Sequence, residues 1–267
     1  VIEGLQAYTS VLEIPGEVDL AIIVVNAKFV LSTIDQCHEK GIKGLCIITA
    51  GFKETGKEGA EAEKQLLAKV REYGMRCVGP NCLGVVNTHP DIRMDGCFAE
   101  SLPERGNIGF VSQSGALGGG ILNILKDLNL GFAQFISIGN QADVNAETAL
   151  EYWEDEKDVE QILLYMESIQ NPANFRKLAS RISKKKPILA LKAGRSAAGA
   201  SAASSHTGSL AGADKAANAL LNQSGVIREY SLQDLFATAK VFANCPIPKG
   251  DRVAIITNSG GPGIMAT

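Results

Sequence analysis

The sequence predicts an α/β protein with doubly wound parallel sheets, and three observations support this fold class. Continuous apolar runs such as VDLAIIVV (18–25) and QILLYMES (161–168) alternate with amphipathic segments. Runs of this kind are typical of strands that helices cover on both faces. The alternation resumes after a looser stretch, rich in Pro, Asp and Gly, at 87–106. We interpret that stretch as a linker between two domains.

The first domain is predicted to hold a helix that ends near Lys40 and another that Gly74 ends. Its strands are predicted at 18–25, 44–50 and 75–79. The second domain repeats the rhythm. Its strands are predicted at 107–113, 132–139, 161–168 and 186–194, and its helices near 115–129, 145–155, 171–184, 209–223 and 231–244.

Two of these helices have recognisable starts, at Asn171–Pro172 and at Ser231, which lies three residues before Asp234. A third α/β unit is predicted to begin with a strand at RVAIITN (252–258) and the turn SGGPG. We therefore expect domains at 1–103, 104–245 and 246–267. Because the chain starts with Val1 and stops just after that turn, we expect both ends to be cut.

Composition excludes several classes of protein. The 267 residues carry 26 basic and 29 acidic side chains, with no long basic run, so we expect no nucleic-acid partner. No apolar run approaches the roughly 20 residues of a membrane span, so we expect no membrane partner. The six cysteines form no Cys-x-x-Cys pair, which argues against disulfides and a metal site and favours the cytoplasm.

The first candidate site is the strand-to-helix turn Ser112-Gln113-Ser114-Gly115. Free backbone N–H groups and the helix dipole at such a turn favour an anion, and the Ser112 and Ser114 hydroxyls would add donors. The alternative is an ordinary serine-capped helix. The spacing matches neither a P-loop nor a hydrolase nucleophile elbow.

Further candidates stand at the ends of the first three predicted strands, where open α/β sheets bind ligands. Because parallel strands present their carboxyl ends together, we expect these residues to line one crevice. They are Val25, Asn26, Phe29, Thr49, Gly51, Asn81 and Cys82. For Cys82, a small buried side chain is the alternative reading.

His206 stands alone in the small-residue loop that follows the last predicted strand of the second domain. A mobile loop that carries one imidazole suits a group carrier that is loaded in one place and discharged in another. An incidental histidine on a surface loop is the alternative. Glu167 ends an apolar strand, so it is either a partner for the imidazole or a solvated strand terminus.

Seven segments, in this order, resemble NDP-forming acyl-CoA synthetases, which are relatives of the succinyl-CoA synthetase α subunit. They are VDLAIIVVNAKF, GLCIITAGFKE, CVGPNCLGVVN, GFVSQSGALG, LLYMESI, AGRSAAGASAASSHTGSLAG and RVAIITNSGGPGIMA. The chain also resembles the α part of ADP-forming acetyl-CoA synthetase, and the resemblance spans essentially the whole chain.

The resemblance implies a Rossmann-like CoA-binding domain followed by a flavodoxin-like domain. It implies conversion of acyl-CoA, ADP and phosphate into free acid, CoA and ATP through an acyl phosphate and a phosphohistidine at His206. Glu167 matches the carboxylate that orients this histidine, and the helix start at 112–115 matches the phosphate site. Asn81 and Cys82 match the loop near the CoA thiol and acyl group.

The resemblance also implies an ATP-grasp partner, separate or fused, that binds ADP or ATP with Mg²⁺, and we expect an oligomer. We expect the first strand and its Gly-rich CoA-phosphate loop to precede residue 1, and this part alone to be inactive. Asn26 stands where relatives often have proline. The alternatives are an acyl-CoA-sensing module of a protein acetyltransferase and a plain CoA-binding protein.

Overall fold

The computed structural model describes residues 1–196 and 214–267 and contains two sheets. The first is a three-stranded parallel sheet in the order β1-β2-β3 (Leu20–Ile23, Gly44–Ile47 and Arg76–Val78). Helices α1 (Ala27–Lys40) and α2 (Lys57–Glu72) pack on it, and their buried residues share one apolar cluster with the strands. Short 3-10 turns lie at Val11–Glu13 and Lys53–Thr55.

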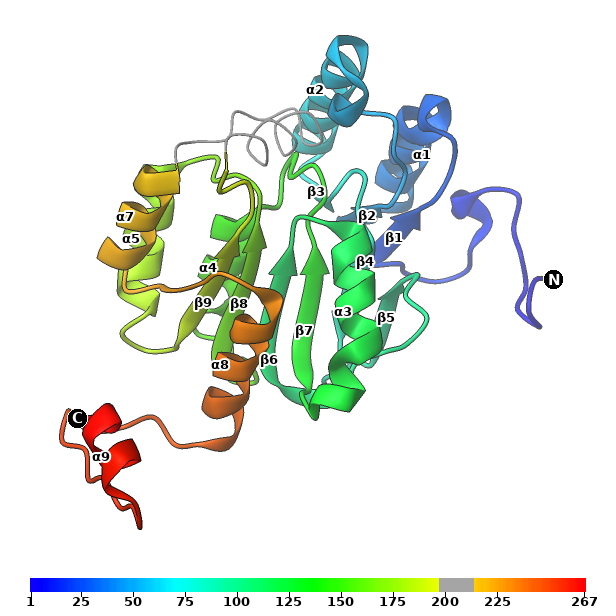
Figure 1. The fold of residues 1–267 in the computed structure, drawn as a ribbon. Helices are drawn as coiled ribbons and strands as arrows, with labels where there is room; N and C mark the ends of the chain where they lie inside the picture. Colours follow the sequence, from blue (N-terminus) through cyan, green and yellow to red (C-terminus); the bar gives the residue numbers. More distant parts are fainter. Residues whose placement is uncertain (197–213) are drawn as a thin grey trace.

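The second sheet has seven strands in the order β10-β9-β8-β6-β7-β4-β5 (Figure 1). Their bounds in chain order are β4 Gly84–Asn87, β5 Met94–Cys97, β6 Arg105–Ser112, β7 Phe132–Ser137, β8 Gln161–Met166, β9 Ile188–Lys192 and β10 Ile227–Glu229. The helices are α3 Gly115–Leu128, α4 Ala146–Trp153, α5 Pro172–Ile182, α7 Asp214–Gln223, α8 Leu232–Asn244 and α9 Gly260–Ala266.

Helices cover both faces of the seven-stranded sheet. Buried residues of α3 and α8 share one cluster with Phe110 of β6 and Leu163 of β8. Buried residues of α4, α5 and α7 share another cluster with Val111 and Ile162 of the same two strands. Successive strand residues point to opposite faces, so a strand buried on both sides reads as a continuous apolar run. The α/β fold class and the main strands and helices are therefore confirmed.

Three predicted details differ from the structure. The stretch interpreted as a linker contains β5, which pairs antiparallel with β4, and β4 pairs antiparallel with β7. The sheet is therefore mixed, and its order joins β4 and β5 to the second half of the chain. The sequence Met-Asp-Gly-Cys of β5 has no apolar run to reveal a strand, because β5 lies at the edge of the sheet and pairs on one side only. The division into 1–103, 104–245 and 246–267 stays a prediction.

The short edge strand β10 was not predicted, because Ile-Arg-Glu carries no continuous apolar pattern. The strand predicted at 252–258 is wrong, since this segment pairs with no strand of the described residues. An extended segment without a neighbour has no partner for its backbone hydrogen bonds. The following helix α9 buries no residue and lies away from both sheets (Figure 1).

The two sheets are joined where the loop after β3 meets the loop after β7. The Asn140 N–H donates to the Pro80 carbonyl at 2.9 Å, and the Ala142 N–H donates to the Gly79 carbonyl at 3.1 Å. Gly139 has a φ of 49°, and a Cβ there would lie 2.3 Å from the Asn81 carbonyl oxygen. Glycine is therefore required for this close approach. None of the described helices is long and apolar enough to cross a membrane.

Candidate functional site

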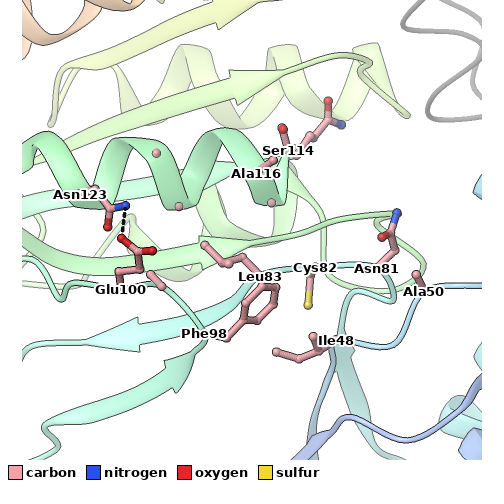
Figure 2. A pocket seen from close by; sticks show the side chains of 15 residues that line it. Ile48, Ala50, Asn81, Cys82, Leu83, Phe98, Glu100, Ser114, Ala116 and Asn123 are labelled. Carbon is pink, nitrogen blue, oxygen red and sulfur yellow. Dashed lines mark hydrogen bonds between the residues drawn. The ribbon is translucent and has the colours of Figure 1, made fainter.

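A cavity of about 570 Å³ lies where the loops after β2 and β3 meet the first turns of α3 (Figure 2). It is therefore built by both halves of the chain. Its lining residues are Ile48, Ala50, Asn81, Cys82, Leu83, Phe98, Ala99, Glu100, Gln113, Ser114, Gly115, Ala116, Gly119, Gly120 and Asn123. Cavities of roughly 300–1,000 Å³ are typical of small-molecule sites.

The structure brings the predicted strand ends together. The Thr49 hydroxyl donates to the Val25 carbonyl at 2.7 Å, and the Asn81 N–H donates to the Thr49 carbonyl at 3.0 Å. Thr49 itself does not line the cavity, whereas its neighbours Ile48 and Ala50 do. The cavity at these strand ends is therefore lined by a partly different set of side chains, and the predicted CoA crevice stays a prediction.

Besides Thr49, four of the residues predicted at the strand ends lie outside the cavity lining. Asn26 caps α1 by accepting the Lys28 N–H at 3.2 Å, and Phe29 is 52% exposed. Val25 is partly exposed at the end of β1. Gly51 has a φ of 108°, and its N–H donates to the Glu54 carboxylate. The role of these four residues in binding CoA stays a prediction.

Asn81 faces the cavity with its amide held in one orientation. Its Nδ2 donates to Asn140 Oδ1 at 3.2 Å, and Asn140 Nδ2 donates to Glu63 at 2.7 Å and to Glu54 at 2.5 Å. Burial raises the pKa of Glu54, but hydrogen bonds from Asn140 and from the backbone of Gly51 and Phe52 outweigh it and hold that pKa below its usual range. The Asn81 amide thus ends a buried polar chain between the sheets.

Cys82 lines the cavity with a thiol that stays protonated. Its Sγ lies 3.9 Å from Cys46 Sγ and 3.3 Å from the Ile47 carbonyl oxygen, and the residue is 4% exposed. The hydrogen bond with Cys46 and burial raise the pKa of the Cys82 thiol far above its usual range. Because the thiolate is the nucleophilic form, this geometry favours the alternative reading, in which Cys82 packs.

The α3 start is a capped helix whose first residues line the cavity. The Ser112 hydroxyl donates to the Ser114 carbonyl at 2.7 Å, and Ser114 Oγ accepts the Leu117 N–H at 3.3 Å. The Ser112 hydroxyl hydrogen is thus used within the helix start, and the role of Ser112 in binding phosphate stays a prediction. The first N–H groups of a helix have no intrahelical acceptor, and the residues that carry two of them, Gly115 and Ala116, line the cavity.

Gln113 joins this helix start to Glu167. The buried Gln113 Oε1 accepts the N–H groups of Glu167 and, at 2.9 Å, of Ser168, and its Nε2 donates to the Ser168 carbonyl at 3.0 Å. The Gln113 N–H itself donates to the Tyr165 carbonyl at 3.1 Å. Both polar atoms of the Gln113 side chain thus hold the end of β8 beside the end of β6. Glu167, at the end of β8, is buried, with 8% of its surface exposed.

His206 lies outside the described residues. Two groups near the site were not singled out from the sequence. Asn140 follows β7, so the rule that ligands gather at strand ends would have found it. Lys192 ends β9 with its side chain buried, and burial lowers the pKa of that amine despite the opposing charges of Asp214 and Glu167. The described residues contain no cluster of metal-binding side chains.

Comparison with protein families gives two matches. Residues 105–242 match a family model described as the succinyl-CoA ligase like flavodoxin domain. Residues 1–88 match a model described as a CoA binding domain. The two matched ranges hold, respectively, α3 with Glu167 and the strand ends with Asn81.

Curated relatives match nearly the whole chain. It is 49% identical over 264 residues to the acetate–CoA ligase (ADP-forming) II subunit alpha of Pyrococcus furiosus, covering 99% of this chain and 57% of that protein. It is 46% identical over 262 residues to subunit alpha of ligase I from the same organism, covering 98% and 56%. The chain therefore spans somewhat more than half the length of the curated relatives it matches.

A solved structure matches the fold over the whole chain. This is the dinucleotide forming acetyl-coenzyme A synthetase 1 of Candidatus Korarchaeum cryptofilum, in complex with phosphate and ADP. The TM-score is 0.91 at 37% sequence identity, and the match covers 100% of this chain and 57% of that one.

Proposed function

The chain belongs to the family of NDP-forming acyl-CoA synthetases, and on that premise we propose that it forms the CoA-binding and histidine-carrying part of an ADP-forming acid–thiol ligase. The complete enzyme interconverts acyl-CoA, ADP and phosphate with free acid, CoA and ATP. In the direction of ATP formation, phosphate displaces CoA from the acyl carbon and gives an acyl phosphate. The phosphoryl group then passes to His206, which releases the acid, and from His206 to ADP.

The α3 start holds the phosphate or phosphoryl group in this proposal. Gly115 and Ala116 line the cavity at the helix start, and the helix dipole favours an anion there by about 0.3–1 kcal/mol when exposed and up to about 2 kcal/mol when partly buried. This attraction stabilises a bound phosphoryl group but cannot create it. The drive for phosphorylation therefore comes from the acyl phosphate or from ATP.

Glu167 orients His206 in this proposal. A carboxylate that accepts the proton of one imidazole nitrogen leaves the other nitrogen free to attack phosphorus. Gln113 supports the assignment, because it fixes the Glu167 backbone beside the helix start where the phosphate would lie. Glu167 would then be part of the catalytic site, while Gln113 would be a positioning residue.

CoA would bind across the ends of β1, β2 and β3, at the surface that contains Val25, Asn26, Phe29, Thr49 and Gly51, with its thiol in the cavity. Asn81, held by Asn140, would orient the thioester end. Cys82 would pack against this end without forming an acyl intermediate, since its thiol stays protonated.

The nucleotide belongs to another part of the enzyme. We propose that an ATP-grasp subunit or fused domain binds ADP or ATP with Mg²⁺, and that the active enzyme is an oligomer in the cytoplasm. The relatives named as alpha subunits support a second subunit. This part alone should not complete the reaction.

The observation that carries the proposal is the shared cavity: strand ends of the CoA-binding half and the α3 start of the flavodoxin-like half line the same space. A thioester entering from one side would therefore meet a phosphate bound on the other. Proximity of this kind can contribute several kcal/mol to a reaction between two bound groups.

The test is phosphoryl transfer in the complete enzyme with its ATP-grasp partner. With γ-labelled ATP, the wild type should take up an acid-labile, base-stable label. His206→Asn should abolish the label, and Glu167→Gln should slow its formation while CoA affinity is unchanged. Full labelling of His206→Asn would contradict the proposal and favour the acyl-CoA-sensing or CoA-binding alternatives.

A further inference from the structure

A cluster of charged and aromatic side chains lies around the end of β10, and the proposed chemistry assigns it no role. Its members come from the segment after β9, from the start of α7, from β10 and from the residue after β10: Arg195, Asp214, Arg228 and Tyr230. We call it the Tyr230 cluster. Arg195 and Asp214 flank the stretch 197–213, which lies outside the described residues and contains His206.

We propose that Tyr230 and Arg228 are positioning residues for the reaction of His206, because they hold both ends of the segment that carries it. Neither residue lines the cavity, so each acts on the reaction only through that segment. This inference rests on the proposed function, in which His206 accepts and donates a phosphoryl group. It adds the part of the protein that fixes where the histidine segment starts and ends.

The first end of the segment is held by the Tyr230 ring. The guanidinium carbon of Arg195 lies 4.5 Å from the ring centroid. A cation within roughly 6 Å of the centroid is attracted to the face of the ring. The Tyr230 hydroxyl donates to Asn218 Oδ1 of α7 at 3.3 Å. The ring therefore contacts both the residue before the segment and the helix after it.

The second end of the segment is held by a buried ion pair. Arg228 Nη2 donates to Asp214 Oδ1, and Arg228 Nη1 donates to the Asp214 carbonyl at 3.3 Å. The Arg228 side chain is 2% exposed, so solvent screens this pair much less than an exposed one. The guanidinium carbon of Arg228 also lies 5.0 Å from the Tyr230 ring centroid. Both ends of the segment are thus joined to one ring and its neighbour on β10.

The chain leaves β9 close to Glu167, the proposed orienting carboxylate. Lys192 pairs with Met166 in the parallel ladder of β8 and β9, and the Ala193 N–H donates to the Met166 carbonyl at 2.8 Å. Glu167 is the residue that follows Met166. The first end of the histidine segment is therefore held near the group that His206 meets in the proposed function.

Fixed ends favour the encounter between a tethered group and its partner. A segment held at both ends samples a smaller volume than one that is held at a single end, so the effective concentration of the group at a nearby site is higher. Releasing one end should therefore slow phosphoryl transfer. CoA binds elsewhere in the proposed function, so its affinity should not change.

The experiment uses the complete enzyme with its ATP-grasp partner and measures the rate at which His206 takes up label from γ-labelled ATP in a single turnover. Tyr230→Ala should slow labelling by roughly 10- to 100-fold, because small displacements of a positioned group cost rates of this order. Tyr230→Phe keeps the ring and should restore most of the rate. Tyr152→Ala is the matched control, since Tyr152 of α4 is 55% exposed and Tyr230 is 50% exposed, and it should label at the wild-type rate.

A second variant tests the other end of the segment. Arg228→Lys keeps the charge but loses the planar fork that contacts Asp214 twice, so it should also be slow. Thermal unfolding verifies that each variant is folded, and calorimetry measures its affinity for CoA, which should equal that of the wild type.

Labelling of Tyr230→Ala at the wild-type rate would overturn the inference. Equal slowing in Tyr230→Phe would also overturn it, because the ring would then not be the cause, and so would a matching loss of CoA affinity, which indicates a general structural role. Failure of the proposed function is distinguishable, because the wild type itself would then take up no label at His206, and both proposals would fall together.

Discussion

The buried side-chain amide of Gln113 joins the start of α3 to the backbone at Glu167. The proposed chemistry depends on both of these features. Its carbonyl oxygen accepts two backbone N–H groups at 167 and 168, and its amino group donates to the Ser168 carbonyl. Leaving buried backbone groups without partners costs about 1–3 kcal/mol each. The amide therefore fixes the backbone of a proposed catalytic residue as well as contributing to stability.

We expect Gln113→Ala to slow labelling of His206 by roughly 10- to 100-fold, because small displacements of a positioned group cost rates of this order. Gln113→Glu keeps the acceptor but loses the donor and adds a charge, so it should also be slow. CoA affinity, measured by calorimetry, should stay within about two-fold of the wild type. Equal losses of labelling and of CoA affinity would indicate a purely structural role.

At the scale of elements, an ion network ties α4 to α5. Glu154 accepts hydrogen bonds from Arg181 and Lys185, which lower its pKa to about 2. A carboxyl group whose pKa is lower in the folded state stabilises the fold above its unfolded pKa of about 4.3, and this contribution is lost as the pH falls towards 2. Arg181 and Lys185 are 45% and 48% exposed, so solvent screens the network.

We expect Glu154→Gln to lower the free energy of unfolding at pH 7 by about 1 kcal/mol, the upper end for exposed pairs. The difference from the wild type should shrink between pH 4.5 and about 2, as the wild-type carboxylate becomes protonated. Urea unfolding followed across this range checks the prediction. A difference that stays constant with pH would show that the charge of Glu154 is not the cause.

The packing of α4 on β6 depends on the absence of a side chain at Gly109. A Cβ at Gly109 would lie 2.9 Å from the ring of Trp153, the fully buried and only tryptophan, whose Nε1 donates to Gln134 at 2.8 Å. Gly109→Ala should therefore cost about 1–3 kcal/mol by overpacking. Gly120→Ala, with open space at its Cβ, is the matched control and should be neutral or stabilising. Tryptophan fluorescence reports both unfolding curves.

At the scale of the whole molecule, Asn140 connects the two sheets. The Asn140 side chain accepts a hydrogen bond from the Asn81 amide and donates to Glu54 and Glu63. Its backbone carbonyl oxygen accepts a hydrogen bond from Lys53. Glu63 also lies 3.4 Å from Lys53 Nζ. An amide suits this position because it donates to the carboxylates and still accepts from Asn81.

We expect Asn140→Asp to destabilise the protein by more than 2 kcal/mol at pH 7, since three carboxylates would then share one buried site. The pKa of the new carboxyl group should be raised. The loss of unfolding free energy relative to the wild type should therefore be smallest at low pH and should grow as the pH rises. Thermal unfolding at several pH values measures it. Asn140→Ala should also lower the free energy of unfolding, but with a weaker dependence on pH. The affinity for CoA should fall in both variants.

The sequence by itself determined the fold class and the positions of the main strands, because continuous apolar runs are typical of strands that helices bury on both faces. It also placed Ser114, Asn81 and Glu167 at strand ends, where parallel sheets gather ligand-binding groups. Only the tertiary structure decided that β4 and β5 join the second sheet, since edge pairing depends on a neighbouring strand and not on apolar pattern. The same holds for the side-chain hydrogen bonds of Gln113 and Asn140, because they join residues 54 to 86 positions apart in the chain. Such contacts depend on how the elements dock, which no local pattern records.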